Sequence, residues 1–270
     1  MIGQRCVQQQ IKATIERNDL ANFIILVGDT GSGRKTLAKE VAKWVDAECI
    51  MIDKGVDAIR EAVSQAYKLS EKVIFVLDGD NMSQAAKSAL LKVTEEPPNQ
   101  VKFILTVTDI SQIFDTLISR ARVYRMDAYT KNEIAWFAGS EDWRYPNFCT
   151  NKYEVDLLNS YGMDEFVSFV NLVVENISTV DSANALKIED KISLTADDGK
   201  YDMKIFLQAF RTECVSRWQE SKDFQVKVMY EEWEKITTDI IAKLRVSSLN
   251  KQSLMDMWIF NIRGVEYADS

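Results

Sequence analysis

A glycine-rich segment has the residue types and spacing of a phosphate-binding loop. The run Gly28-Asp29-Thr30-Gly31-Ser32-Gly33-Arg34-Lys35-Thr36 follows an apolar stretch and precedes a helical pattern. In that setting, backbone N–H groups and the N-terminus of a helix can surround a phosphate. The alternative is a strand-to-helix turn without a ligand. The segment predicts a P-loop, and its candidate nucleotide-binding residues are Gly28, Gly31, Ser32, Gly33, Arg34, Lys35 and Thr36.

The residues after the last glycine differ from those that ATP hydrolysis needs. A working P-loop has lysine directly after this glycine and then a Ser or Thr that binds Mg²⁺. Here Arg34 takes the lysine position, and Lys35, which is a cation, takes the hydroxyl position. A shift by one residue would use Lys35 and Thr36, but it rotates the side chains by about 100° and so requires a distorted loop. The sequence therefore allows ATP or ADP to bind, argues against Mg²⁺, and predicts no efficient hydrolysis by this chain alone.

Alternating strand and helix patterns place this loop in a parallel sheet. Apolar strands are expected at 23–27, 49–52, 73–77, 102–107 and 121–126, with helical patterns in between. Such alternation predicts a parallel sheet with helices on both faces. After residue 127 the strand pattern disappears, and only Pro146 interrupts a series of expected helices. These helices lie at 131–137, 152–160, 164–177, 183–188, 202–220, 223–244 and 253–263, with a small linker at 176–182.

Composition excludes several classes of function. The 270 residues include no histidine, which excludes Ser-His-Asp catalysis and histidine-ligated metals. The four cysteines lack a CxxC pattern, so neither a disulfide framework nor a zinc site is expected. No apolar run approaches the ~20 residues of a membrane helix, and the first residues contain no secretory signal, so a cytoplasmic protein is expected. Positive and negative charges balance in 1–127, so the net charge of −8 lies in 128–270, which disfavours a free-standing DNA binder.

Further motifs follow the P-loop in a recognisable order. They are Val73–Asp78, the stretch from Ala89 to Lys92 with Glu95-Glu96-Pro97-Pro98, the segment 101–109, and Ser119-Arg120-Ala121. Together they resemble the AAA+ clamp-loader subunits of replicative DNA polymerases, most closely the delta-prime type of bacterial DNA polymerase III. The resemblance covers 2–127 and rests on helical content beyond. It implies an α/β P-loop AAA+ domain at 1–127, a small helical lid domain at 128–178, and a helical collar domain at 179–270.

Several positions depart from the pattern of this family. Asp78 falls on either of the two acidic Walker B positions, and then Leu77 or Gly79 falls on the other, so either register lacks one carboxylate. Asp80, close by, is interpreted as a solvated loop residue. Acidic side chains occur at 160–165, where the family has the basic sensor-2 residue, and the zinc-binding cysteines of many bacterial relatives are missing. Three elements of ATP hydrolysis are therefore altered together.

The resemblance assigns roles to other residues. Arg120 would be an arginine finger that acts in trans on the ATP site of a neighbouring subunit, and Thr108 would be the sensor-1 residue. The alternative for Arg120 is to cap the C-terminus of a helix. The candidate DNA-backbone contacts are Ser83, Gln84, Lys87 and Ser111. For Ser83 the alternative is a helix N-cap, and for Lys87 it is an exposed helix residue.

The implied function is that of a clamp-loader subunit that helps to place the sliding clamp on primer–template DNA. It would not hydrolyse ATP itself, and its partners would be the other clamp-loader subunits, the sliding clamp and DNA. An active ATPase motor subunit that uses Lys35, Thr36 and Asp78 is the alternative, whereas a nucleotide kinase lacks acceptor and lid motifs. The short chain and the missing zinc module favour a phage-encoded member. The helices after 179 carry aromatic residues at spacings of buried faces, namely Phe206, Phe210, Trp218, Phe224, Trp233 and Trp258.

Overall fold

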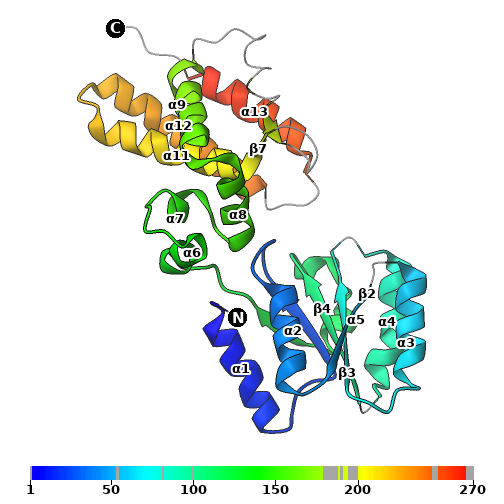
Figure 1. Ribbon diagram of the computed structural model, residues 1–270. Helices are drawn as coiled ribbons and strands as arrows, with labels where there is room; N and C mark the ends of the chain where they lie inside the picture. The colour runs from blue at the N-terminus through cyan, green and yellow to red at the C-terminus, as the bar shows by residue number, and fades with distance from the viewer. Residues whose placement is uncertain are drawn as a thin grey trace. The chain divides into compact units, whose positions relative to one another are not determined.

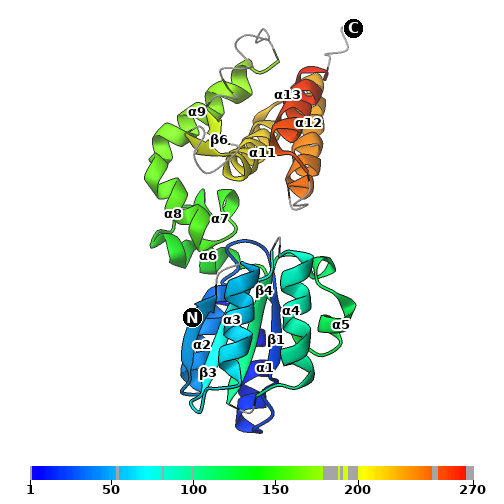
Figure 2. The ribbon, with the colours of Figure 1, turned by 90° about the vertical axis from the view of Figure 1, so that its right-hand side faces the viewer.

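The chain forms two compact units, residues 1–129 and 130–270, which two views show (Figure 1; Figure 2). The computed structural model describes residues 2–52, 55–80, 82–98, 100–178, 188, 191–193, 200–244 and 249–265. Within these ranges, no helix combines the length and apolar character needed to cross a membrane. The helix expected at 183–188, apart from its last residue, and most of the linker expected at 176–182 lie outside the described residues. The domain boundaries at 127 and 178 stay predictions.

The first unit contains a five-stranded parallel sheet with the strand order β2-β3-β4-β1-β5. Its strands are β1 (Phe23–Val27), β2 (Glu48–Ile52), β3 (Val73–Asp78), β4 (Val101–Val107) and β5 (Arg122–Arg125). Strand β1 lies between β4 and β5, and β3 is the next strand beyond β4. The loop after β1 therefore leaves the carboxyl edge of the sheet beside the ends of β3 and β4, which is where ligands bind in open α/β sheets.

Helices cover both faces of this sheet, as the sequence pattern predicts (Figure 2). Helices α1 (Arg5–Glu16) and α2 (Arg34–Trp44) pack on one face, and α3 (Val56–Ala66) and α4 (Gln84–Glu95) pack on the other. Every residue of β1 is buried, because alternate side chains face the two helical layers. Two short turns follow β4, a 3₁₀ turn η1 (Ile110–Gln112) and the four-residue helix α5 (Asp115–Ile118).

The second unit is mainly helical. Its helices are α6 (Lys131–Ala138), α7 (Tyr145–Phe148), α8 (Lys152–Tyr161), α9 (Met163–Asn176), α11 (Met203–Glu220), α12 (Phe224–Lys243) and α13 (Lys251–Arg263). Two expectations for this half are wrong. Strands β6 (Ile192–Ser193) and β7 (Tyr201–Asp202) form a parallel pair, too short to leave a strand pattern in the sequence. Pro146 lies in the first turn of α7, where the missing N–H of proline costs no helical hydrogen bond.

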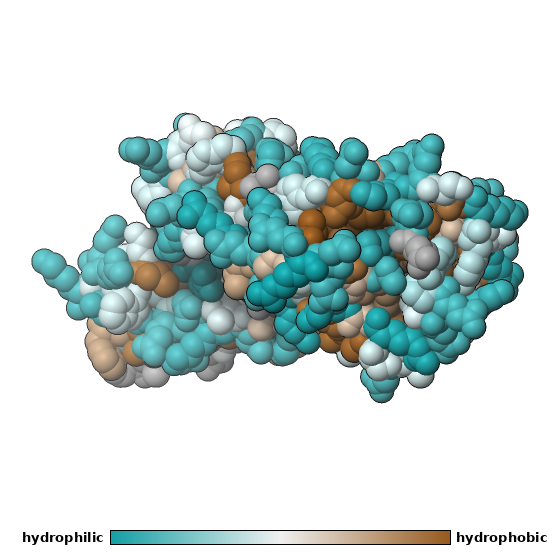
Figure 3. Space-filling model, turned by 90° about the horizontal axis from the view of Figure 1, so that it is seen from below, coloured by the Kyte–Doolittle hydropathy of each residue, from teal (hydrophilic) through white to brown (hydrophobic). Residues whose placement is uncertain are grey.

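Aromatic rings form the core of the second unit. Phe206, Phe210, Trp233 and Trp258 are completely buried, which agrees with the predicted buried faces. Trp218 and Phe224 are not, since their exposed fractions are 40% and 78%. Both lie beside the turn between α11 and α12, and the ammonium of Lys227 lies 4.8 Å from the centre of the Trp218 ring. Figure 3 shows one face of the protein, which is mainly hydrophilic with separate hydrophobic areas.

Candidate functional site

The glycine-rich segment has the backbone form of a P-loop. It begins where β1 ends, and the Gly28 N–H donates to the carbonyl of Val107 at 3.0 Å. Gly31 and Gly33 have φ angles of 82° and 90°, in the left-handed region that glycine reaches without a steric cost. A Cβ atom at Gly28 would lie 2.7 Å from the Cβ of Met126, so only glycine fits there. Helix α2 then starts at Arg34 and directs its first N–H groups toward the loop.

Residues far apart in the sequence hold this loop in place. The side-chain amide of Gln4 donates to the carbonyl of Asp127 at 2.7 Å and accepts from the Asp127 N–H at 2.7 Å. The hydroxyl of Tyr129 donates to the carbonyl of Ser32 at 3.0 Å, and the Gln4 amide contacts the same carbonyl at 3.4 Å. Both ends of the first unit therefore fix the position of the loop.

Two ion pairs connect the start of α2 to the end of β3. Arg34 Nη1 lies 3.2 Å from Asp80 Oδ2, and their side chains are only 12% and 19% exposed. Lys35 Nζ lies 3.0 Å from Asp78 Oδ2. The Asp80 N–H also donates to Asp78 Oδ1 at 3.1 Å, which fixes the two carboxylates relative to each other. Each cation of the loop is therefore paired with a carboxylate of the same chain. The charges of these four side chains sum to zero.

Asp80 is the site residue that sequence reasoning missed. Its interpretation as a solvated loop residue is wrong, because Asp80 Oδ1 accepts from the Thr108 N–H at 2.6 Å and from the Thr108 hydroxyl at 2.8 Å. The structure therefore brings Asp78, Asp80, Thr108, Arg34 and Lys35 together. The available signal was topological, since the carboxyl ends of strands β3 and β4 lie side by side in a parallel sheet.

The end of β3 favours one of the two Walker B registers. Leu77 is buried in the core between the sheet and helices α3 and α4, so it faces away from the loop. Asp78 pairs with Lys35, which favours the register in which Asp78 would be the metal-binding residue and Gly79 would stand at the position of the catalytic glutamate. No side chain fits at Gly79, because a Cβ atom there would lie 2.5 Å from Val107 Cγ1.

Replacing Gly79 with alanine should destabilise the first unit by about 1–3 kcal/mol, the usual cost of overpacking. The added methyl group would press on Val107 and displace the segment that carries Asp80. Gly55→Ala is a matched control, because its Cβ would have no atom within 4 Å and its φ angle of −62° suits alanine. Urea unfolding of both variants measures the difference. Equal stability of the two variants would contradict the close packing at Gly79.

The residues present do not fit a Mg²⁺ ion. The fold normally supplies a hydroxyl and a carboxylate to this metal, but here the ammonium of Lys35 contacts the only carboxylate at that position, Asp78. Thr36 is exposed, and α2 is helical from Arg34 onward, without the distortion that the shifted register requires. In the described ranges, no three His, Cys, Asp or Glu side chains form a metal-binding group. Burial raises the pKa of the Cys149 and Cys214 thiols, which keeps them protonated.

Arg120 is partly exposed and has contacts within its own chain. Its Nη1 donates to the carbonyl of Thr116 at 2.7 Å, and its Nη2 lies 3.0 Å from Glu95 Oε1. Thr116 belongs to α5, so the predicted alternative contact with carbonyls at the end of a helix is present. The guanidinium is 37% exposed and the Glu95 carboxylate 54% exposed. A role in trans stays a prediction.

The four candidate DNA contacts have different local roles. Ser83 caps α4, with its hydroxyl accepting from the Ala86 N–H at 3.2 Å, and Gln84 is exposed in the first turn of the same helix. For Lys87 the alternative, an exposed helix residue, is wrong, because the residue is 8% exposed and its ammonium lies 5.7 Å from the centre of the Phe114 ring. The Ser111 N–H and hydroxyl donate to Asp109, which lowers the pKa of that carboxyl. DNA binding by these residues stays a prediction.

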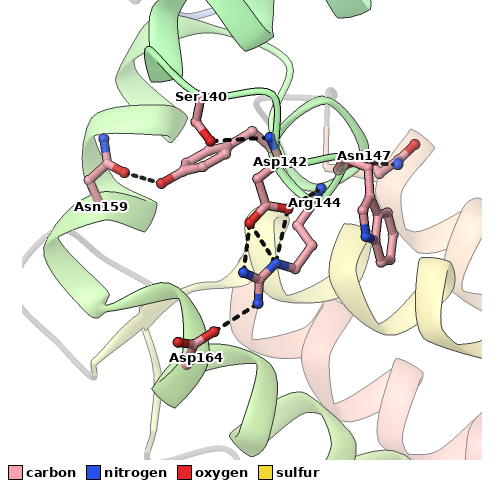
Figure 4. A network of polar contacts seen from close by, with 8 residues as sticks. Ser140, Asp142, Arg144, Asn147, Asn159 and Asp164 are labelled. Atoms are coloured by element: carbon pink, nitrogen blue, oxygen red, sulfur yellow. Dashed lines mark hydrogen bonds and ion pairs between the residues drawn. The ribbon is translucent and has the colours of Figure 1, made fainter.

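The acidic segment at the expected sensor-2 position carries ion pairs (Figure 4). Asp164 and Glu165 lie in the first turn of α9, where negative charge is favourable. Arg144 donates through Nη1 to Asp164 at 2.9 Å and through Nε and Nη2 to Asp142, and it lowers the pKa of Asp142. Lys200 pairs with Glu165. The basic partners of this segment therefore come from elsewhere in the second unit.

Sequence comparisons relate the chain to proteins of DNA replication. Residues 44–130 match the family model "DNA polymerase III, delta subunit". The small subunit of replication factor C from Haloarcula marismortui is 29% identical over 160 residues, 53% of this chain and 49% of that protein. Subunit gamma of DNA polymerase III from Buchnera aphidicola is 27% identical over 166 residues, 50% of this chain and 46% of that protein. The chain thus spans about half the length of the curated relatives it matches, and it is homologous to clamp-loader subunits.

Structural comparisons confirm the fold. A gamma subunit-related protein of DNA polymerase III from Thermotoga maritima aligns with a TM-score of 0.53 at 15% identity, covering 94% of this chain and 98% of that one. The RuvB Holliday junction branch migration motor of the same organism aligns with a TM-score of 0.50 at 15% identity, covering 94% of this chain and 81% of that one. The predicted fold, a parallel α/β sheet between helices followed by a helical part, is therefore correct.

Proposed function

We propose that this chain is a non-hydrolysing subunit of a clamp loader, similar to the delta-prime type, that helps to place a sliding clamp on primer–template DNA. The observation that carries the proposal is the pair of salt bridges Arg34–Asp80 and Lys35–Asp78 in a chain homologous to clamp-loader subunits. A phosphate loop that is neutralised by its own carboxylates keeps the architecture of an ATPase while lacking the groups for its chemistry.

The loss of hydrolysis follows from the charges that phosphoryl transfer requires. The reaction depends on placed cations, above all Mg²⁺, and on a residue that orients the attacking water. Gly79 has no side chain for the second task, and Lys35 opposes the metal at Asp78. ATP or ADP would therefore serve as a structural ligand. A turnover of order 1 s⁻¹ or more that Lys35→Ala abolishes would instead favour the active motor subunit.

Arg120 is the residue through which we propose that the chain takes part in catalysis. Its guanidinium is partly exposed, and its two contacts are with a surface carboxylate, Glu95, and a backbone carbonyl. Both contacts are weak enough to exchange for a phosphate of a neighbouring subunit, because exposed ion pairs contribute about 0–1 kcal/mol. The proposal also includes DNA contacts of Ser83, Gln84, Lys87 and Ser111, a cytoplasmic location and a phage-encoded origin.

Assembly into the complex should depend on residues 130–270. We expect the full chain to co-purify from its native source with other clamp-loader subunits that mass spectrometry identifies. A chain that ends at Tyr129 should remain folded, because the first unit has its own core on both faces of the sheet, but it should be missing from the complex. Circular dichroism checks the folding of the shortened chain, and native mass spectrometry checks its association. The shortened chain appearing in the complex would contradict a collar role for the second unit.

A further inference from the structure

We infer that the ammonium of Lys35 takes the place of Mg²⁺, so that the loop binds a nucleoside di- or triphosphate without a divalent cation. The inference rests on nucleotide binding as part of the proposed function. It adds which group of the protein neutralises the phosphate charge in place of the metal. It starts from the disagreement between the residues of this site and the metal that the fold normally holds.

The position of Lys35 supports this replacement. In a working site, the hydroxyl residue at position 35 and the carboxylate at position 78 would hold the metal. Here Lys35 Nζ lies 3.0 Å from Asp78 Oδ2, and the same carboxylate accepts from the Asp80 N–H. A Mg²⁺ ion would have to displace the ammonium and would then lie beside it as a like charge. Lys35, whose side chain is 54% exposed, therefore competes with the metal for Asp78 and supplies a positive charge at the same place.

The remaining donors at the site indicate an anionic ligand. A guanidinium has five N–H donors, and in the described part of the chain only Nη1 of Arg34 has a partner, Asp80. The Arg34 side chain is 12% exposed, and none of its unpaired donors is fully buried, so a ligand can reach them. The N–H groups of Gly33, Arg34 and Lys35 likewise have no acceptor among the described residues. A phosphate chain satisfies donors of this kind with its oxygens.

Charge balance points the same way. In a working site, a lysine, a neutral hydroxyl residue and two carboxylates carry a net charge of −1 before the metal binds. Here Arg34, Lys35, Asp78 and Asp80 sum to zero. The site therefore repels an anionic ligand less than a metal-free working site does, and it depends less on a divalent cation to offset the phosphate charge.

Isothermal titration of the full chain with ATP and with ADP tests the inference. Affinity in EDTA should equal that in excess Mg²⁺ within about threefold. The variant Lys35→Thr, which restores the hydroxyl, should bind at least about tenfold more tightly with Mg²⁺ than without it. Lys35→Met should weaken binding in EDTA by about tenfold, whereas Lys39→Met, which changes an exposed lysine of the same helix, should leave it unchanged.

Several results would overturn the inference. Stimulation of wild-type binding by Mg²⁺ of more than about tenfold would show that the metal still has a place. Absence of ATP and ADP binding in both buffers would show that the ion pairs close the loop completely. In either case the clamp-loader proposal keeps its own test, because co-purification with partner subunits does not depend on nucleotide. Equal melting temperatures of the variants exclude misfolding as a cause.

Discussion

Replacing Arg120 with alanine should lower the DNA-stimulated ATPase and the clamp loading of the reconstituted complex while this chain still folds and assembles. Loss of an arginine finger typically costs about 10³ or more in rate at the site that it serves. A clamp loader has several ATP sites, so the complex should lose part of its total activity. The isolated chain should show no change in nucleotide binding, because Arg120 contacts Glu95 and Thr116 rather than the P-loop.

Two further variants separate this role from helix capping. Arg120→Lys should rescue little of the ATPase activity, since one ammonium does not replace the planar guanidinium. Glu95→Gln removes the ion-pair partner of Arg120 and should leave the ATPase activity of the complex intact. Capping alone predicts a stability loss of under ~1 kcal/mol, partial rescue by lysine, and full activity at matched assembly. A destabilised Arg120→Ala chain in a fully active complex would rule out the finger.

Replacing Trp258 with alanine should lower the free energy of unfolding of the second unit by about 3–5 kcal/mol, the usual cost of removing a buried tryptophan. The side chain is 0% exposed, and its ring packs edge-on against Phe206 and Phe210 at centroid distances of 5.5 and 4.9 Å. Its indole N–H also donates to the Thr237 hydroxyl at 3.0 Å. This residue therefore joins α13 to both α11 and α12.

Urea unfolding monitored by circular dichroism measures this loss. Trp258→Phe should fall between wild type and alanine, because it keeps most of the apolar contact and loses the hydrogen bond to Thr237. Trp136→Ala is the matched control, since Trp136 is 64% exposed and its loss should change stability by less than about 0.5 kcal/mol. A similar small effect for both tryptophan-to-alanine variants would contradict a core centred on Trp258.

The fold of the first unit could be predicted because strands β1, β3 and β4 are mainly apolar runs that alternate with helical patterns. The strand 23–27 and the helix that begins at Arg34 were expected within one residue of their observed bounds. Strands β6 and β7 could not be predicted, because two residues carry no periodicity. The exposure of Trp218 and Phe224 could also not be predicted from the sequence. Helical spacing identifies the apolar face of a helix but not whether another helix covers that face.

The sequence predicts the loop and one of its two counter-charges, Asp78, but not the other, Asp80. Arg34 and Lys35 depart from a known spacing, and Asp78 ends a strand, so each carries a signal in the sequence. Asp80 has no such signal, since an aspartate two residues beyond a strand is common in loops. Its role depends on Thr108, which is 28 residues away and becomes a neighbour only through the pairing of β3 with β4.

The central place of β1 in the sheet determines when the loop can be completed during synthesis. Both neighbours of β1, the strands β4 and β5, are made after it, as is Asp127, which pairs with Gln4 across 123 residues. During synthesis, residues 28–36 are therefore made before the residues that hold this loop in its folded conformation. The nascent chain must carry its first strand unpaired until nearly the whole unit has emerged, an interval in which an apolar edge is open to chaperones and to wrong partners.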